Sequence, residues 1–256
     1  MAKPYEGRIE LTDANPPAGA QAGEAVPRAQ AAAACSDAYA IFALLFQLPS
    51  ADEARGLADG SLVSDLRDIA AELDSLAGSA LAAAIEEPAA ALEAACAGKD
   101  PEAFMHELRI EYTRLFDHPD WPLIRIYEAL FLYAESHDRA DPKYALPRMF
   151  VNKAALDAER CYRGMGLVRD PNVRIPADHM ATELEFLSYV HRRRAEALLA
   201  GDAEAFVHAD AALAEFDHLH VEKWFAPFFA RVAETAQGPY VHLAQLSTVF
   251  TSALRP

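Results

Sequence analysis

Apolar residues recur at helical spacing along most of the chain, and this periodicity constrains the fold more than any other feature. Tyr39, Phe42, Leu45 and Phe46, for example, would share one face of a helix. No segment alternates apolar and polar residues over a useful strand length. The pattern predicts helices over about residues 34–47, 52–58, 61–76, 79–86, 88–98, 100–116, 127–133, 147–163, 176–199, 202–218, 225–236 and 240–253.

The composition supports the same class of fold. Hydrophobic residues make up 52% of the 256 residues, enough to bury a substantial core. Ala and Leu dominate and long β-branched runs are few, which favours helix over sheet. We therefore expect an all-α fold, a compact single helical domain of about ten helices spanning residues 31–256. Residues 1–30 are rich in Ala, Pro and Gly, so we expect them to form a disordered segment.

Charge and cysteine spacing exclude several classes of function. The net charge of −16 argues against binding to nucleic acid or to an anionic membrane surface. Cys35, Cys96 and Cys161 stand far apart, as isolated thiols do in a reducing compartment. Residues 1–30 lack the apolar region of a signal peptide, and the apolar run 31–46 is too short to span a bilayer. We expect a cytoplasmic protein.

The stretch from Pro176 to Leu187 has the character of a helix start. Pro176 suits the first helical position, and Asp178 can cap or charge the first turn. A cationic His179 would oppose the helix dipole there. Helix formation alone does not call for this histidine, and on spacing alone the Asp178–His179 pair could be a cap, a pair of metal ligands or neither.

Two sequence signatures resemble those of TorD-like chaperones, a group that includes the DmsD and NarJ types. The first is Glu111-Tyr112-Thr113-Arg114-Leu115-Phe116, followed by a proline-containing loop and then Tyr127-Glu128. The second is Pro176-Ala177-Asp178-His179 followed by Glu183-Leu184-Glu185-Phe186. Further residues fit the family's order: Tyr162 with Gly166-Leu167, and His220 with Trp224, Pro227 and Phe228.

The resemblance implies an all-helical chaperone with no catalytic residues and no cofactor of its own. Such a protein binds the N-terminal twin-arginine leader of a molybdopterin-containing oxidoreductase subunit. It holds that subunit for cofactor insertion before export or assembly. The implied partner is thus the catalytic subunit of a molybdenum oxidoreductase, with neither nucleic acid nor membrane involved, and the chaperone is a monomer or a domain-swapped homodimer. The residues implied to bind the leader or partner are Leu115, Phe116, Pro119, Trp121, Tyr127, Glu128, Asp178, His179 and Glu183.

The chemistry of such a leader agrees with the residues near the signatures. Guanidinium groups pair bidentately with carboxylates, and the apolar part of a leader needs an apolar groove. The available carboxylates are those of Asp117, Asp120, Glu128, Asp178, Glu183 and Glu185, and the aromatic residues are Phe116, Trp121, Tyr127 and Phe131.

The main alternative is a helical metal-binding protein. His179 and Glu183 lie one turn apart, and Glu215 and His218 have the Glu-x-x-His spacing of di-iron bundles. A di-iron site needs two such motifs, and only one is present, so we expect no metal.

Other classes of function have less support in the sequence. The glycine-rich loops that bind nucleotides and the nucleophile elbow of hydrolases are missing. The run Arg192-Arg193-Arg194 is expected to form a solvated helix face. A third possibility is a generic helical adaptor, which would show no preference for a leader.

Overall fold

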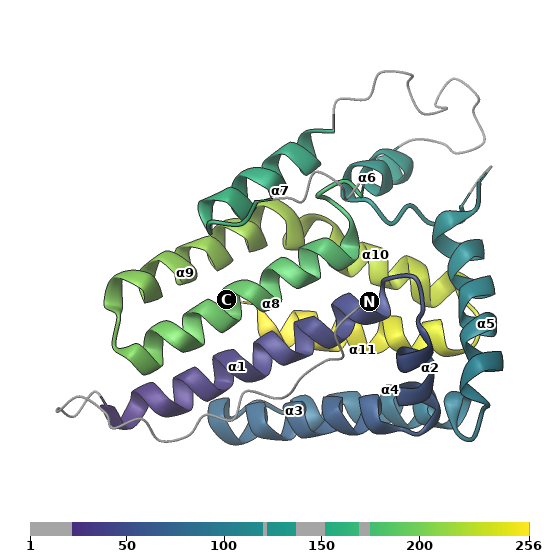
Figure 1. The fold of residues 1–256 in the computed structure, drawn as a ribbon, viewed down its shortest axis with the longest axis horizontal. Coiled ribbons are helices and arrows are strands. Elements are labelled where there is room, and N and C mark those ends of the chain that lie inside the picture. The colour runs from purple at the N-terminus through teal and green to yellow at the C-terminus, as the bar shows by residue number, and fades with distance from the viewer. Residues whose placement is uncertain (1–21, 120–121, 137–151, 169–174, 256) are drawn as a thin grey trace.

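A computed structural model describes residues 22–119, 122–136, 152–168 and 175–255, and within these ranges the chain is almost entirely helical (Figure 1). The only β-type pairing among the described residues is an isolated antiparallel bridge between Tyr127 and His179. The all-α prediction is thus confirmed. The helices are α1 (Ala22–Leu45), α2 (Ala51–Ala58), α3 (Ser61–Ala77), α4 (Leu81–Cys96), α5 (Pro101–Tyr112), α6 (Glu128–Ser136), α7 (Lys153–Gly164), α8 (Met180–Ala200), α9 (Ala203–Phe216), α10 (Glu222–Thr235) and α11 (Pro239–Leu254), with π-helical turns η1 (Thr113–Asp117) and η3 (Asp217–Val221).

One hydrophobic core joins the first and last helices. Helix α1 lies along α8 in Figure 1, and it also packs on α3 and α11. Phe42 of α1 contacts Phe250 of α11 with ring centroids 5.3 Å apart. Phe46, at the end of α1, packs against Phe116, Phe228 and Phe229. The predicted apolar stripes are buried, including the one formed by Phe104, Leu108, Tyr112 and Leu115.

Helix α1 begins earlier than the sequence pattern predicts. It starts at Ala22, so residues 22–30 of the predicted disordered segment are helical, and residues 1–21 lie outside the described part. Pro27 lies inside the helix, in its second turn, where its missing N–H removes one backbone hydrogen bond. Ala32 and Ala33 are buried together with Ala195 of α8. Within residues 22–30, Ala29 is fully buried and the Arg28 guanidinium lies 5.0 Å from the centre of the Phe206 ring of α9. These contacts stabilise a stretch whose composition alone indicated disorder.

Two prolines that were predicted to lie near helix starts lie inside helices instead. The segments predicted as 79–86 and 88–98 form one helix, α4, with Pro88 in its interior. Pro227 lies inside α10, which begins at Glu222. The apolar face of α4 is buried on both sides of its proline, at Ile85 and Leu92, and this packing offsets the lost backbone hydrogen bond.

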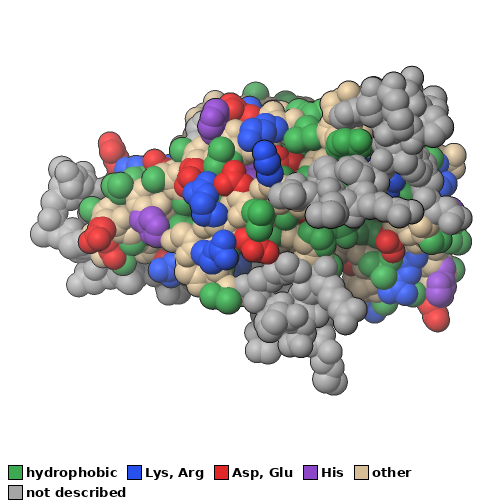
Figure 2. Space-filling model, turned by 90° about the horizontal axis from the view of Figure 1, so that it is seen from above, with side chains coloured by type: hydrophobic (Ala, Val, Ile, Leu, Met, Phe, Trp, Pro, Cys, Tyr) green, Lys and Arg blue, Asp and Glu red, His purple; other side chains and the backbone are tan. Residues whose placement is uncertain are grey.

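One face of the molecule carries side chains of both charges, although the chain as a whole has a net charge of −16. Figure 2 shows acidic and basic side chains interspersed over one face of the molecule. Ion pairs between separate helices include Arg160 with Glu215 at 2.8 Å and Arg194 with Asp210 at 2.8 Å. Within the described ranges, no helix combines the length and the apolar character needed to cross a membrane.

Candidate leader-binding site and its buried polar centre

The two signature segments lie side by side although they are fifty residues apart in the chain. The backbone N–H of Glu128 donates to the carbonyl oxygen of Asp178 at 2.9 Å, and the N–H of Met180 donates to that of Ile126 at 3.0 Å. These two bonds form the bridge between Tyr127 and His179. Each segment immediately precedes a helix, so the bridge fixes the starts of α6 and α8 relative to each other.

Asp178 is fully buried and uses both of its carboxylate oxygens within the protein. They accept hydrogen bonds from Asn152 Nδ2 at 3.0 and 2.9 Å, and Oδ2 also accepts from the backbone N–H of Ala129 at 3.1 Å. Asn152 in turn caps α7 by accepting a bond from the N–H of Ala155 at 2.8 Å. Burial raises the pKa of Asp178, while these hydrogen bonds oppose the shift. The Asp178 side chain therefore ties the starts of α6, α7 and α8 together.

His179 is the N-cap of α8, and its ring is neutral near pH 7. Its Nδ1 accepts a hydrogen bond from the backbone N–H of Ala181 at 3.2 Å, and burial lowers its pKa to about 4. A neutral acceptor does not oppose the helix dipole, which resolves the conflict seen in the sequence. The prediction that the helix starts near Pro176 with Asp178 in its first turn was wrong, because the helix begins at Met180.

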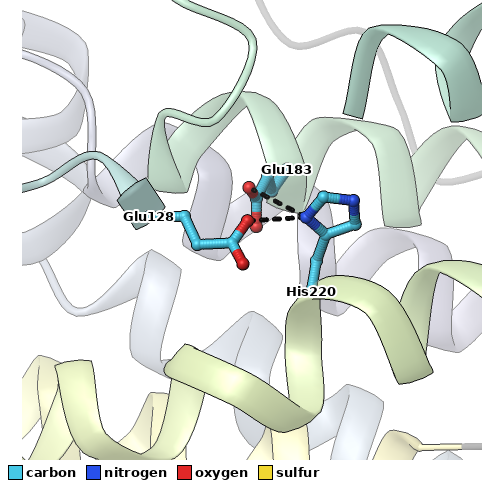
Figure 3. Close-up of side chains that lie close together, drawn as sticks. All are labelled: Glu128, Glu183 and His220. Carbon is cyan, nitrogen blue, oxygen red and sulfur yellow. Dashed lines mark hydrogen bonds and ion pairs between the residues drawn. The ribbon is translucent and has the colours of Figure 1, made fainter. Parts of the chain in front are cut away.

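Glu128, Glu183 and His220 form a second buried group, here called the Glu-Glu-His cluster (Figure 3). His220 Nδ1 lies 2.6 Å from Glu128 Oε2 and 3.9 Å from Glu183 Oε1. The three side chains come from the start of α6, the first turn of α8 and the π-helical turn η3. None is more than 2% exposed. A π-helical turn often accompanies a functional site, and here it carries His220 into the core.

The electrostatics of the cluster are unusual for a protein interior. Burial and the neighbouring Glu128 carboxylate raise the pKa of Glu183 well above its ordinary value, although Trp224 Nε1 donates a hydrogen bond to Glu183 Oε2 at 2.8 Å. In the part of the chain that the structure describes, no Lys or Arg forms an ion pair with either carboxylate. Glu183 Oε1 and His220 Nε2 are buried without a hydrogen-bond partner.

The exposed part of the predicted site is small. Leu115 and Phe116 are buried in η1, where Phe116 packs against Tyr112, Phe228 and Tyr240. Asp117 and Pro119 are exposed and Tyr127 is half-buried. Burial, followed by the Asp117 and Asp178 carboxylates, raises the pKa of Tyr127.

The remaining predicted residues are scattered or undescribed. Trp121 and Asp120 lie outside the described residues. Phe131 is buried, and Glu185 is exposed and accepts a hydrogen bond from Gln47 Nε2 at 2.7 Å.

Of the nine residues predicted to bind the leader, the structure brings five together at the starts of α6 and α8. They are Tyr127, Glu128, Asp178, His179 and Glu183.

The residue pairs considered as metal ligands in the sequence have other partners in the structure. His179 uses Nδ1 to cap α8, and the histidine beside Glu183 is His220. Glu215 pairs with Arg160, while the exposed His218 pairs with Glu222 at 3.1 Å. His220 was noted in the sequence only for its place in the family's order. Its contacts with Glu128 and Glu183 are non-local, so spacing along the chain gives no sign of them.

Comparison with known proteins decides the family. A family model described as the nitrate reductase delta subunit matches residues 79–230, which is more than half of the chain. The chain belongs to this family. It is the family of NarJ- and TorD-like chaperones for redox-enzyme maturation, which act on catalytic subunits of molybdoenzymes, so the resemblance seen in the sequence is confirmed. Searches of curated proteins and of solved structures return no match. Both signatures and the Glu-Glu-His cluster lie within the matched region.

Proposed function

We propose that this maturation chaperone binds the N-terminal twin-arginine leader of a molybdopterin-containing oxidoreductase subunit and holds that subunit in the cytoplasm until its cofactor is inserted. The family supports a client of this kind. The observation that carries the proposal is the bridge between Tyr127 and His179, because it brings the two signatures of the family together at one place.

In this proposal, the exposed residues of the first signature make the contacts with the leader. Asp117 offers a carboxylate that can accept two parallel hydrogen bonds from a guanidinium group. The half-buried Tyr127 ring offers a face for a second cation, and the exposed Pro119 adds apolar surface. An exposed ion pair contributes little on its own, so affinity depends on how well the apolar part of the leader excludes water from these contacts.

The buried residues of the signatures position this surface. The Asp178 carboxylate accepts hydrogen bonds from Ala129 and Asn152. His179 caps α8, and its ring packs in a T-shaped arrangement with the Tyr127 ring, with centroids 5.1 Å apart. Glu128 and Glu183 are too deeply buried to reach a peptide on the surface. We therefore assign the second signature to ordering the site, and the loop that begins at Asp117 to recognition.

Co-purification tests the proposal in its full form. A molybdopterin oxidoreductase subunit is co-expressed with this protein, once with its leader and once with the leader deleted. We expect a complex only when the leader is present, and a weaker complex with Tyr127→Ala or Asp117→Asn. Asp68→Asn, an exposed aspartate on α3, is the matched control and should leave the complex intact. Equal recovery of the subunit with and without its leader would refute leader recognition.

A further inference from the structure

The Glu-Glu-His cluster presents three potential ligand atoms from three separate elements. One oxygen of Glu128, one oxygen of Glu183 and one ring nitrogen of His220 lie within 4.8 Å of one another. Among the described residues, no other group of three or more His, Cys, Asp or Glu side chains meets this condition. In Figure 3 the two carboxylates and the imidazole point toward a common centre.

Among the described residues, the cluster has no permanently charged cationic partner, and His220 is positive only when it is protonated. Two carboxylates and one histidine are buried together, and no described Lys or Arg pairs with them. An uncompensated charge in a protein interior is costly, so such a group requires bound protons or a cation. A divalent cation would neutralise both carboxylates at once.

The orientation of Glu183 provides an independent observation. Its side chain is 0% exposed, and its Oε1 has no hydrogen-bond partner although it lies 3.9 Å from His220 Nδ1. The indole N–H of Trp224 holds the other oxygen, Oε2, at 2.8 Å. Ligating carboxylates are commonly oriented by such an outer hydrogen bond, which leaves one oxygen for the metal. His220 is oriented in turn by stacking on Phe216, with ring centroids 4.5 Å apart.

We propose that Glu128, Glu183 and His220 bind a divalent first-row transition-metal ion. One imidazole nitrogen and two carboxylate oxygens are donors that suit Zn²⁺, Fe²⁺ or Mn²⁺, and the absence of a thiolate among them disfavours softer ions. Zinc–ligand bonds are about 2 Å long. His220 and Glu128 must therefore move apart from their 2.6 Å contact as the ion replaces the proton between them. The bound ion would link α6, α8 and η3 at the centre of the two signatures.

The site is tested on the full-length protein with metal alone. The protein is stripped with a chelator, dialysed against Zn²⁺ or Co²⁺, and analysed for metal content, Co²⁺ absorption in the visible range and melting temperature. We expect about one ion per chain, as for a site with three protein ligands, and a higher melting temperature. A folded wild-type protein that binds no ion would overturn the proposal and leave protons as the only counter-charge of the cluster.

Variants locate the ion. Glu183→Gln and His220→Asn should abolish stoichiometric binding while circular dichroism confirms that they remain helical. Trp224→Phe, which removes only the outer hydrogen bond, should weaken binding about 10- to 100-fold. His218→Asn is the matched control, because His218 forms an exposed pair with Glu222 of the same chemistry and should leave binding unchanged. Undiminished binding by Glu183→Gln would overturn the assignment. Since none of these measurements involves a leader peptide, their outcome is independent of the proposed function.

Discussion

Two buried polar groups lie next to each other at the start of α8, and they differ in how completely the protein satisfies them. Asp178 and His179 bond to the starts of three helices, and both Asp178 oxygens are occupied. The Glu-Glu-His cluster leaves two buried atoms without a partner. Native proteins rarely leave such atoms unpaired without a reason. Asp178 and His179 are therefore positioning residues, whereas the Glu-Glu-His cluster has polar atoms that could still bind a ligand. The sequence signatures alone do not distinguish these two groups.

The largest expected effect comes from removing the satisfied group. Asp178→Ala would leave the N–H of Ala129 and the amide of Asn152, both part-buried, without their acceptor, and we expect the free energy of unfolding to fall by about 3 kcal/mol. Denaturant unfolding measures this loss. Asp117→Ala, at an exposed position, should change the same quantity by less than about 0.5 kcal/mol. If Asp178→Ala kept full stability but lost leader binding, Asp178 would be a contact residue and not a positioning residue.

The neutral cap at His179 predicts a pH dependence of stability. Its pKa of about 4 in the folded protein lies below its ordinary value of 6.5, so the unfolded chain binds the proton more readily between these values. The contribution of His179 is therefore fully present above pH 6.5 and is lost as the pH falls toward 4, by up to about 3 kcal/mol.

Buried His191, whose pKa is lowered to about 3, also makes the free energy of unfolding fall as the pH is lowered. His179→Asn keeps a capping side chain but cannot titrate, so its stability should fall less steeply with acid than that of the wild type. Denaturant unfolding at several pH values measures both curves. Parallel curves for the two proteins would contradict the neutral-cap assignment.

A substitution in the Glu-Glu-His cluster should lower the free energy of unfolding of the metal-free protein much less than Asp178→Ala does. Glu183→Gln keeps the volume of the side chain and its acceptor for Trp224, and it removes a carboxyl group that lies beside Glu128. We expect metal-free stability to change by less than about 1 kcal/mol, measured by chemical unfolding in the presence of chelator. A loss as large as that of Asp178→Ala would mean that the cluster is as fully satisfied as its neighbour.

The smallest effect is expected at the exposed counterpart of the cluster. His218 and Glu222 pair at the surface, where solvent screens the interaction. His218→Asn should be indistinguishable from wild type in thermal unfolding. A measurable loss of stability would show that exposure is a poor guide to the importance of His–Glu pairs in this protein.

The sequence predicted the helical core well because apolar spacing is a local property. The stripes at Tyr39 to Phe46 and Phe104 to Leu115 are buried as expected. The helical residues 22–30 of α1 could not be predicted, since they make contacts with residues far along the chain, such as that of Arg28 with the Phe206 ring. Similarly, packing on both sides of Pro88 keeps it inside a helix that its local signal would end.

The sequence indicated several residues that the structure brings together, but it did not indicate their chemistry. The signatures indicated Asp178 and His179, yet the neutrality of His179 follows from burial, which spacing along the chain does not encode. The Glu-Glu-His cluster joins residues 128, 183 and 220 through a π-helical turn that alters the helical register. The contribution of Trp121, the disorder of residues 1–21 and the oligomeric state stay predictions.

The central claim, that the surface around Asp117 and Tyr127 recognises a twin-arginine leader, is tested most directly by titrating the protein with a leader peptide in a calorimeter. The account predicts saturable binding and roughly 10-fold weaker binding of a peptide in which both arginines are lysines, because lysine cannot make the bidentate contact. It also predicts that Asp117→Asn removes this preference, whereas Asp68→Asn retains it. Equal affinity of the wild-type protein for the two peptides, or no binding of either, would contradict the account.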